Sequence, residues 1–191
     1  MITATRKRFT IDEYHRLAEL GFFEPDDRLE LIRGEIIQMP TKKTPHSVCN
    51  VLLVRTLTIL LGELAIVRGQ EPIILPADSE PQPDVSIVRN RSDFYLANHP
   101  EPADIFLLIE ISESTLRFDR ETKLSLYAEN EINDYWIFNL VDNILEMYSE
   151  PYRNPQGKFG YASKRIALPR ATVPLPGFPD LALDLSQVFP S

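Results

Sequence analysis

Two acidic residues near the ends of apolar segments have the clearest chemical potential in this sequence. Glu110 lies near the downstream end of the apolar segment 105–112, on one alternating face of the strand that this segment predicts. Asp84 begins an earlier strand segment, directly after Pro83. A buried carboxylate normally has a cation, a metal ion or hydrogen-bond donors beside it, because burying it alone is costly. The pattern leaves two interpretations open: a metal-binding pair, or a strand entry and a salt bridge at the edge of the core.

A lysine on the helix predicted after this strand could act at the same site. Asp119 can cap a helix that runs to about Asn130, and Lys123 lies in its first turn or so. An ammonium group beside a phosphate could orient a water molecule or stabilise developing negative charge. The alternative is a solvated helix lysine that pairs with Asp119, four residues before it.

A predicted hairpin upstream adds two further carboxylates. Residues 28–39 contain two short strands that join at Arg33-Gly34, which suits a two-residue turn. With that turn, Glu30 and Glu35 fall on one face, which is unusual for a half-buried hairpin. We expect Glu35 to belong to the functional site; pairing with the basic residues of the next helix is the alternative.

The helix predicted after the hairpin has a strong start signal in Thr44 and Pro45. His46 could contact a phosphate from the N-terminus of this helix, or it could be a surface or cap-region histidine. The apolar residues that follow, 48–65, nearly encircle the helix axis. We therefore expect this helix to be largely buried.

Strand and helix segments are interspersed along the chain, which predicts an α/β or α+β fold with a mixed β-sheet flanked by helices. A capping box at Thr10 and Glu13 begins an N-terminal helix. A short strand is expected at 73–75 and a hairpin-like stretch at about 159–168. No segment has the composition of a linker, so we expect residues 1–191 to form a single domain.

The composition excludes several classes of protein. The 191 residues, 43% hydrophobic and 25% charged, suffice for a real core and are too apolar for a disordered chain. The single cysteine, Cys49, excludes a disulfide framework and a cysteine-rich zinc site. Charge or glycine interrupts the apolar stretches, whereas a membrane helix needs roughly 20 apolar residues. No secretory signal pattern is present. We expect a soluble, cytoplasmic protein without membrane contact.

Charge is distributed unevenly along the chain. The 20 basic and 28 acidic residues give a net charge of −8, whereas proteins that bind nucleic acids usually have a basic excess. Residues 41–70 nevertheless have a net charge of +3, and residues 71–115 a net charge of −7. The two segments could form a phosphate-binding surface beside a metal site, although chance unevenness would look the same.

The order of these motifs resembles the PD-(D/E)xK nuclease superfamily. Pro83-Asp84 is similar to the first half-motif, and Glu110 to the acidic residue of the second. The lysine that usually follows two residues later is replaced by Ser112, so Lys123 would have to serve from the adjacent helix. Over almost the whole chain the sequence resembles the Uma2 family, also called DUF820, of restriction-endonuclease-like proteins. The motifs that carry this resemblance are 28–39, His46, Gln82-Pro83-Asp84-Val85, 108–112, 119–124 and Asp134-Tyr135-Trp136-Ile137.

The resemblance implies a fold, a cofactor and an activity. The fold would be a restriction-endonuclease-like core with an added N-terminal helix and hairpin and a C-terminal β-hairpin. Mg²⁺, or Mn²⁺, would be bound by Asp84, Glu110 and the main-chain carbonyl of Ile111. Lys123 would assist hydrolysis of a DNA phosphodiester, and the protein would act as a homodimer. Two alternatives stay open: a catalytically inactive binding or scaffold module, which Ser112 and the acidic charge favour, and a two-carboxylate hydrolase with another substrate.

Overall fold

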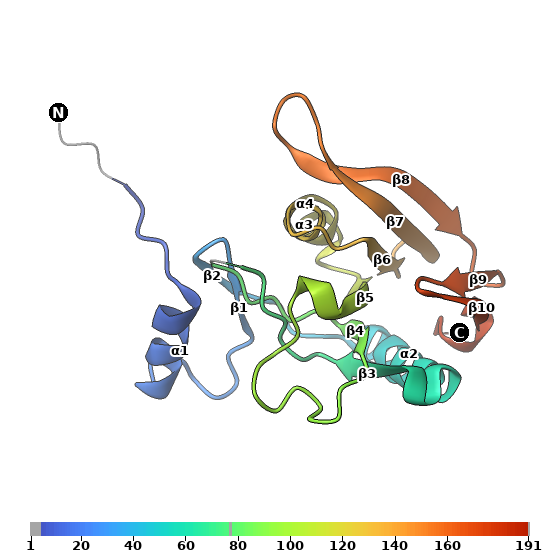
Figure 1. Ribbon diagram of the computed structural model, residues 1–191, viewed down its shortest axis with the longest axis horizontal. Helices are drawn as coiled ribbons and strands as arrows, with labels where there is room; N and C mark the ends of the chain where they lie inside the picture. Colours follow the sequence, from blue (N-terminus) through green and yellow to red (C-terminus); the bar gives the residue numbers. More distant parts are fainter. Residues whose placement is uncertain (1–4, 77, 191) are drawn as a thin grey trace.

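A six-stranded sheet lies at the centre of the computed structural model, which describes residues 5–76 and 78–190. The strand order is β3-β4-β5-β6-β7-β8 (Figure 1). β5 and β6 are parallel, and every other neighbouring pair is antiparallel. The predicted mixed sheet is therefore confirmed. The strands are β3 (Ala65–Gly69), β4 (Val85–Arg89), β5 (Ile105–Ser112), β6 (Asp134–Asn139), β7 (Ile144–Arg153) and β8 (Phe159–Ala167).

β5 runs through the middle of the sheet and is covered on both faces. Leu107 and Ile109 belong to one apolar cluster and Leu108 to the other, as the alternation of strand side chains requires. A parallel pair of strands needs a long crossover, and the helical crossover from β5 to β6 covers the second face. This crossover consists of α3 (Leu116–Phe118), a π-helical turn η3 (Asp119–Lys123) and α4 (Leu124–Glu129).

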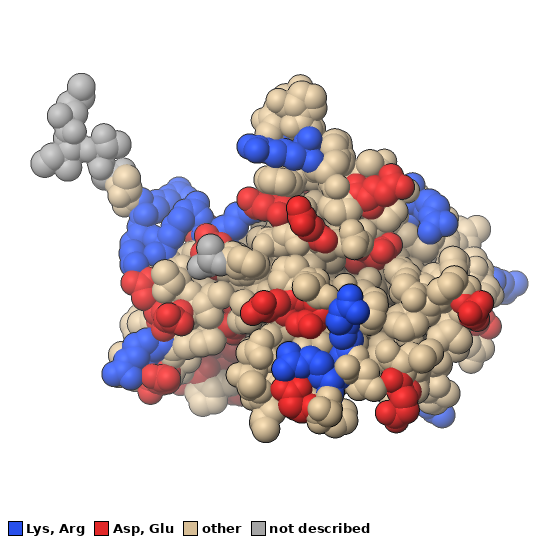
Figure 2. All heavy atoms as spheres, viewed as in Figure 1, with Lys and Arg blue, Asp and Glu red and all other residues tan. Residues whose placement is uncertain are grey.

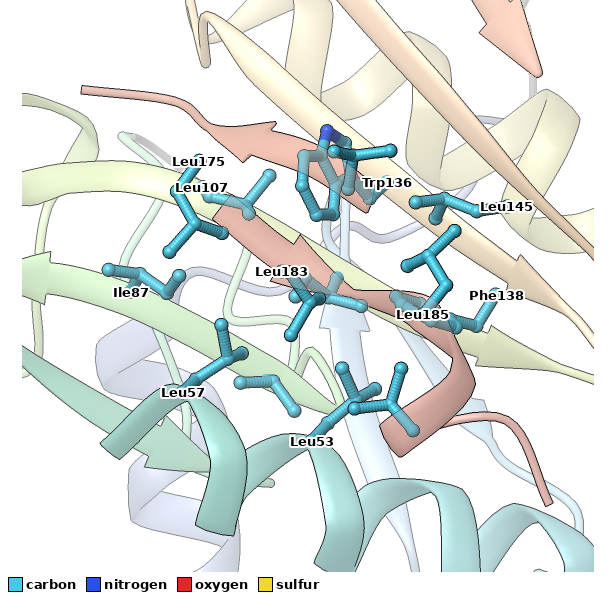
Figure 3. Packing of buried hydrophobic residues seen from close by; sticks show 14 of the residues in the cluster. Leu53, Leu57, Ile87, Leu107, Trp136, Phe138, Leu145, Leu175, Leu183 and Leu185 are labelled. Atoms are coloured by element: carbon cyan, nitrogen blue, oxygen red, sulfur yellow. The ribbon is translucent and has the colours of Figure 1, made fainter. Parts of the chain in front are cut away.

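The first face is covered by α2 (Thr44–Leu61) and by a C-terminal hairpin of β9 (Thr172–Leu175) and β10 (Phe178–Asp184). Figure 3 shows Leu53 and Leu57 of α2 in the same apolar layer as Leu183, close to the strands of the sheet. The buried stripe of α2 has helical spacing and consists of His46, Cys49, Leu53, Leu57 and Leu61.

The outer face of α2 is uncovered and mixes exposed apolar with polar side chains, so the prediction of a largely buried helix was wrong for this face. Val51 is 64% exposed and Ile59 is 73% exposed. Within the described residues, Thr44–Leu64 is the one helical stretch that is long and apolar enough, by length and composition alone, to cross a membrane. Its inner face forms part of the core around the sheet.

The predicted N-terminal additions are present. The capping box forms as expected: the side chain of Thr10 accepts a hydrogen bond from the main chain of Glu13, whose side chain accepts one in return. Main-chain hydrogen bonds between Leu31 and Glu80 tie the hairpin to the loop before β4. The hairpin is therefore held beside the edge of the sheet where β4 begins. These elements are α1 (Ile11–Glu19), β1 (Leu29–Ile32) and β2 (Glu35–Gln38).

Some strands differ from the sequence prediction. Residues 73–75 form no strand, and Leu75 makes only an isolated bridge to Ser79. The segment 159–168 is not a hairpin by itself, because β8 pairs with β7. The edge strand β3 was missed, since the helix ends earlier than expected at Gly62, which has a φ of 50°. Short 3₁₀ turns complete the structure at η1 (Gly62–Leu64), η2 (Pro102–Asp104) and η4 (Leu185–Gln187).

Candidate active site

The antiparallel pairing of β4 and β5 brings Asp84 and Glu110 to the same edge of the sheet. Val85 pairs with Ile109, so the residue before Val85 lies beside the residue after Ile109. Both carboxylates line one cavity, and both are almost fully buried. The other charged side chains and the histidine that line this cavity are Arg28, Glu30, Lys42, Lys43, His46, Glu113, Asp119 and Lys123.

Asp84 is held in an oriented, ionised state. Its Oδ2 accepts a hydrogen bond from the main-chain N–H of Ile111 and is paired with Nε2 of His46, each at 2.9 Å. Lys42 Nζ lies 3.4 Å from Oδ1. Burial works to raise the pKa of Asp84, but the hydrogen bond and charge of His46 and the charge of Lys42 outweigh it, so the pKa is lowered. Asp84 is therefore a carboxylate with one oxygen fixed by the protein.

Glu110 is held by a different pair of donors. Its Oε1 accepts hydrogen bonds from Lys123 Nζ at 2.7 Å and from the Tyr127 hydroxyl at 2.8 Å. Burial raises the pKa of Glu110 well above its ordinary value, and the positive charge of Lys123 only partly opposes this shift. Glu110 Oε2 takes part in no hydrogen bond within the described residues, which leaves it for a ligand.

Lys123 lies between two carboxylates. Its Nζ is 2.7 Å from Glu110 Oε1 and 3.1 Å from Glu30, and its side chain is 1% exposed. Burial works to lower the pKa of Lys123, but the charges of Glu110, Glu30 and Asp119 outweigh it and raise the pKa above its ordinary range. Lys123 is therefore a buried cation, and the alternative of a solvated helix lysine paired with Asp119 does not describe it.

Ser112, which occupies the position of the usual lysine, has a structural partner. Its hydroxyl donates a hydrogen bond of 2.6 Å to Asp119 Oδ2, and the Thr115 hydroxyl donates one of 2.7 Å to the same atom. These bonds connect the end of β5 to the π-helical turn that carries Lys123. π-Helical turns inside helices occur frequently at functional sites. Asp119 is buried in the cavity wall, a position that the expected helix-cap role did not suggest.

The two carboxylates of the β1–β2 hairpin, Glu30 and Glu35, lie in different surroundings. The predicted register is confirmed, since Ile32 pairs with Glu35 and Glu30 pairs with Ile37. Glu30 is 3% exposed and lines the cavity, and both of its carboxylate oxygens lie 3.1 Å from Lys123 Nζ. Glu35 is 44% exposed and lies near Arg8, away from the cavity lining. The structure therefore brings Glu30, and not Glu35, to Lys123. The sequence signal that distinguishes the two is that Glu30 lies farther from the Arg33-Gly34 turn than Glu35 does.

His46 also lies differently from the expected phosphate contact. Its side chain is only 10% exposed, and Nε2 is engaged with Asp84. The physical reason is the inward direction of the first turn of α2, where His46 belongs to the buried stripe. His46 thus orients Asp84 instead of presenting a free ring to solvent.

The donor set fits a hard divalent cation. The cavity combines four buried carboxylates, Glu30, Asp84, Glu110 and Asp119, with three lysines, one arginine and one histidine. No group of three or more His, Cys, Asp or Glu is arranged around one point in the described part of the chain, so an ion would need main-chain or water oxygens as well. Mg²⁺ characteristically uses one or two carboxylates and keeps several waters.

Comparison with known proteins identifies the fold and the family. A solved structure from Anabaena variabilis, described as a putative nuclease belonging to DUF820, superposes with a TM-score of 0.70 over 95% of this chain and 97% of that chain, at 21% identity. No curated protein matches the sequence. The family model of Uma2, described as "Putative restriction endonuclease", matches residues 11–186. Since this match spans nearly the whole chain, the protein belongs to the Uma2 family.

Proposed function

We propose that the protein is a metal-dependent endonuclease that hydrolyses phosphodiester bonds in DNA. The observation that carries this proposal is the convergence of Asp84, Glu110 and Lys123, from three separate segments, on one buried cavity. Two carboxylates with a lysine beside them can accommodate a hard cation and a phosphate together. The description of the Uma2 family supports the same activity.

Mg²⁺, or Mn²⁺ in its place, would be held by Asp84, Glu110 and the main-chain carbonyl of Ile111; all three residues line the cavity. Such an ion, when bound, polarises the scissile phosphate and lowers the pKa of a coordinated water. The surplus of carboxylates over cations in the cavity would be reduced by the same binding.

The protein's own side chains orient these groups. His46 and the Ile111 N–H hold Asp84 Oδ2, and Tyr127 holds Glu110 Oε1. Lys123 would contact a non-bridging phosphate oxygen or the attacking water, where its charge stabilises the negative charge that develops on the phosphate. Because Lys123 is already fixed by its carboxylate partners, it does not have to be ordered when the substrate binds.

Cleavage of supercoiled plasmid DNA in Mg²⁺ or Mn²⁺ tests this proposal. Asp84→Asn should reduce divalent-metal affinity and cleavage together, whereas Lys123→Met should retain metal binding and lose at least about 100-fold in rate. Glu19→Gln, an exposed change on α1, is the matched control and should cleave like the wild type. Undiminished metal-dependent cleavage by Asp84→Asn would refute the assignment.

A catalytically inactive binding module is the second candidate. It is favoured by the contacts of Lys123, whose charge is already shared by Glu110 and Glu30. Calorimetric titration with Mn²⁺ separates the two proposals, since only the enzyme needs a productive metal site. No heat of binding and no cleavage would support the binding module.

We further propose that the protein acts as a homodimer, because two copies could present one cavity to each strand of a duplex. The outer face of α2 is the candidate contact. Its exposed residues include Val51 and Ile59, and Thr44–Leu61 contains no acidic residue in a chain of net charge −8. Two acidic molecules could therefore meet along this helix without carboxylate repulsion.

A further inference from the structure

One segment of this acidic chain is strongly basic. Residues 151–170 contain five basic residues and no acidic ones, which leaves 15 basic and 28 acidic residues in the rest of the chain. All five are exposed. Basic charge without acidic neighbours, which favours contact with phosphate, therefore runs along this segment, at a higher net charge than the +3 of residues 41–70. The five residues are Arg153, Lys158, Lys164, Arg165 and Arg170.

This segment contains the end of β7, all of β8 and the turn after it, and only its first part, with Arg153 and Lys158, lies at the end of the β7–β8 hairpin that projects beyond the sheet. β6 pairs with β7 only as far as Ser149, whereas β7 and β8 remain paired to Arg153 and Phe159. The end of the hairpin is therefore a free two-stranded ribbon, which extends away from the body in Figure 1. In Figure 2 its projecting tip shows lysine or arginine atoms and no acidic ones.

The tip of the ribbon is internally ordered. The guanidinium of Arg153 lies 5.4 Å from the centre of the Phe159 ring. The side chain of Asn154 accepts a hydrogen bond of 2.8 Å from the main chain of Lys158, and Gly157 supplies the positive φ of the turn. Tyr152 is 46% exposed beside them. Cations next to an accessible aromatic ring in a fixed ribbon are suited to phosphate and base contacts.

Protection of the sheet edge explains only part of this charge. β8 is an edge strand, and exposed lysines discourage pairing with other chains. That role accounts for Lys164 and Arg165. It does not account for Arg153 and Lys158 at the tip; Glu150, at the start of the free ribbon, is the one acidic residue of that part. Within the described residues, Lys164 is the only one of the five that forms an ion pair, with Glu146.

We propose that the β7–β8 ribbon is the arm that binds duplex DNA by entering its major groove. The major groove is about 12 Å wide and admits a two-stranded ribbon. The inference rests on the proposed nuclease function and adds to it the element that captures the substrate. An acidic protein surface, including that of a second copy, is the competing partner.

Fluorescence anisotropy with a labelled 30-base-pair duplex in EDTA tests the arm without cleavage. Arg153→Gln combined with Lys158→Gln should weaken binding about tenfold. It should also reduce the slope of log affinity against log salt by about 2, because each lost phosphate contact removes about 0.9. Arg6→Gln combined with Arg16→Gln removes the same charge from exposed positions and should leave the slope unchanged. Thermal melting confirms that both variants are folded.

Several outcomes would overturn the proposal that the ribbon binds DNA. They are equal salt slopes for the two variants, equal affinity for single-stranded and duplex DNA, and loss of self-association in the ribbon variant with unchanged DNA affinity. The last outcome would assign the ribbon to an acidic protein partner. Failure of the nuclease proposal looks different, because the wild type would then bind duplex DNA through the ribbon without cleaving it in Mg²⁺ or Mn²⁺.

Discussion

At the scale of single residues, the charge balance around Lys123 is what the cavity depends on. A buried lysine with no partner would lose its proton, but Glu110 and Glu30 both lie within 3.1 Å of it. These contacts keep Lys123 cationic and also leave the carboxylates in excess. The same residues thus supply a cation for phosphate and an electrostatic reason for a divalent ion to bind.

Substitution of Glu30 and of Glu35, one at a time, distinguishes a role in the site from a role in folding. Glu30→Gln should reduce cleavage by about tenfold to 100-fold, since it removes a negative charge beside Lys123. Gln keeps the size of Glu30 and an oxygen that can accept from Lys123, so the variant should stay folded, with a loss of about 1–3 kcal/mol in the free energy of unfolding. Glu35→Gln should leave the rate unchanged. Plasmid cleavage and thermal melting measure both, and full activity of Glu30→Gln would contradict the role of Glu30.

Glu146, on β7, should control the acid stability of the protein. Its side chain is fully buried and is bonded to Arg120, Lys164 and Tyr148. Burial works to raise its pKa, but these bonds lower it to about 2. A carboxyl whose pKa is lowered by folding stabilises the protein above its unfolded pKa, and this stabilisation is lost as the pH falls from about 4.5 toward 2.

Glu146→Gln should therefore cost about 2 kcal/mol at pH 7, because it replaces charge-assisted hydrogen bonds. The difference from the wild type should shrink as the pH is lowered through 4.5. Urea denaturation at pH 7, 5 and 3.5 measures this dependence. A difference that stays constant over this range would show that Glu146 contributes through packing and not through its charge.

At the scale of elements, the π-helical turn η3 places the second half of the site. It directs both Asp119 and Lys123 into the cavity, while Arg120 in the same turn reaches Glu146 on the sheet. A π turn contains one residue more than the α-helical path between the same points. Deletion of Glu121, an exposed residue within it, should relax the turn to α-helix and keep α4 in its packing register.

The expected result of this deletion is a folded protein without activity. α4 would still pack through its buried face, but Asp119 and Lys123 could no longer both reach the cavity. Circular dichroism, Mn²⁺ titration and plasmid cleavage measure the three properties, and Glu121→Ala is the control that keeps the chain length. Retained cleavage by the deletion variant would show that the turn does not position Lys123.

Elements that are determined by local sequence can be predicted from it, whereas elements that are determined by contacts with distant residues cannot. The mixed sheet, the hairpin register and the approach of Asp84 to Glu110 follow from alternation and turn chemistry. The π turn and the burial of Lys123 depend on contacts with Glu30, 93 residues away along the chain. Helix periodicity contains no information about such distant contacts. The sequence spacing was therefore compatible both with an exposed Lys123 and with a Lys123 that lies in the site.

At the scale of the whole molecule, α2 also shows what sequence patterns do not reveal about contacts. Its apolar residues surround the axis, yet only one stripe of them packs on the sheet. Sequence reasoning treated the helix as covered, because it cannot tell a core of one chain from an interface between two. The exposed apolar side chains on this face are the reason for the proposal that a second copy covers it.

Val51→Asp tests this assignment, since it adds a charge at a position that is 64% exposed and removes no core contact. The wild type should sediment with twice the chain mass of 21.9 kDa, and the variant with the chain mass itself. Val141→Asp, at a position 60% exposed in the turn between β6 and β7, is the matched control and should remain dimeric. Analytical ultracentrifugation at about 1 to 100 μM distinguishes monomer from dimer, because micromolar dissociation constants are common for specific association. A monomeric wild type throughout that range would remove the dimer, and with it the account of how two cavities reach the two strands of one duplex.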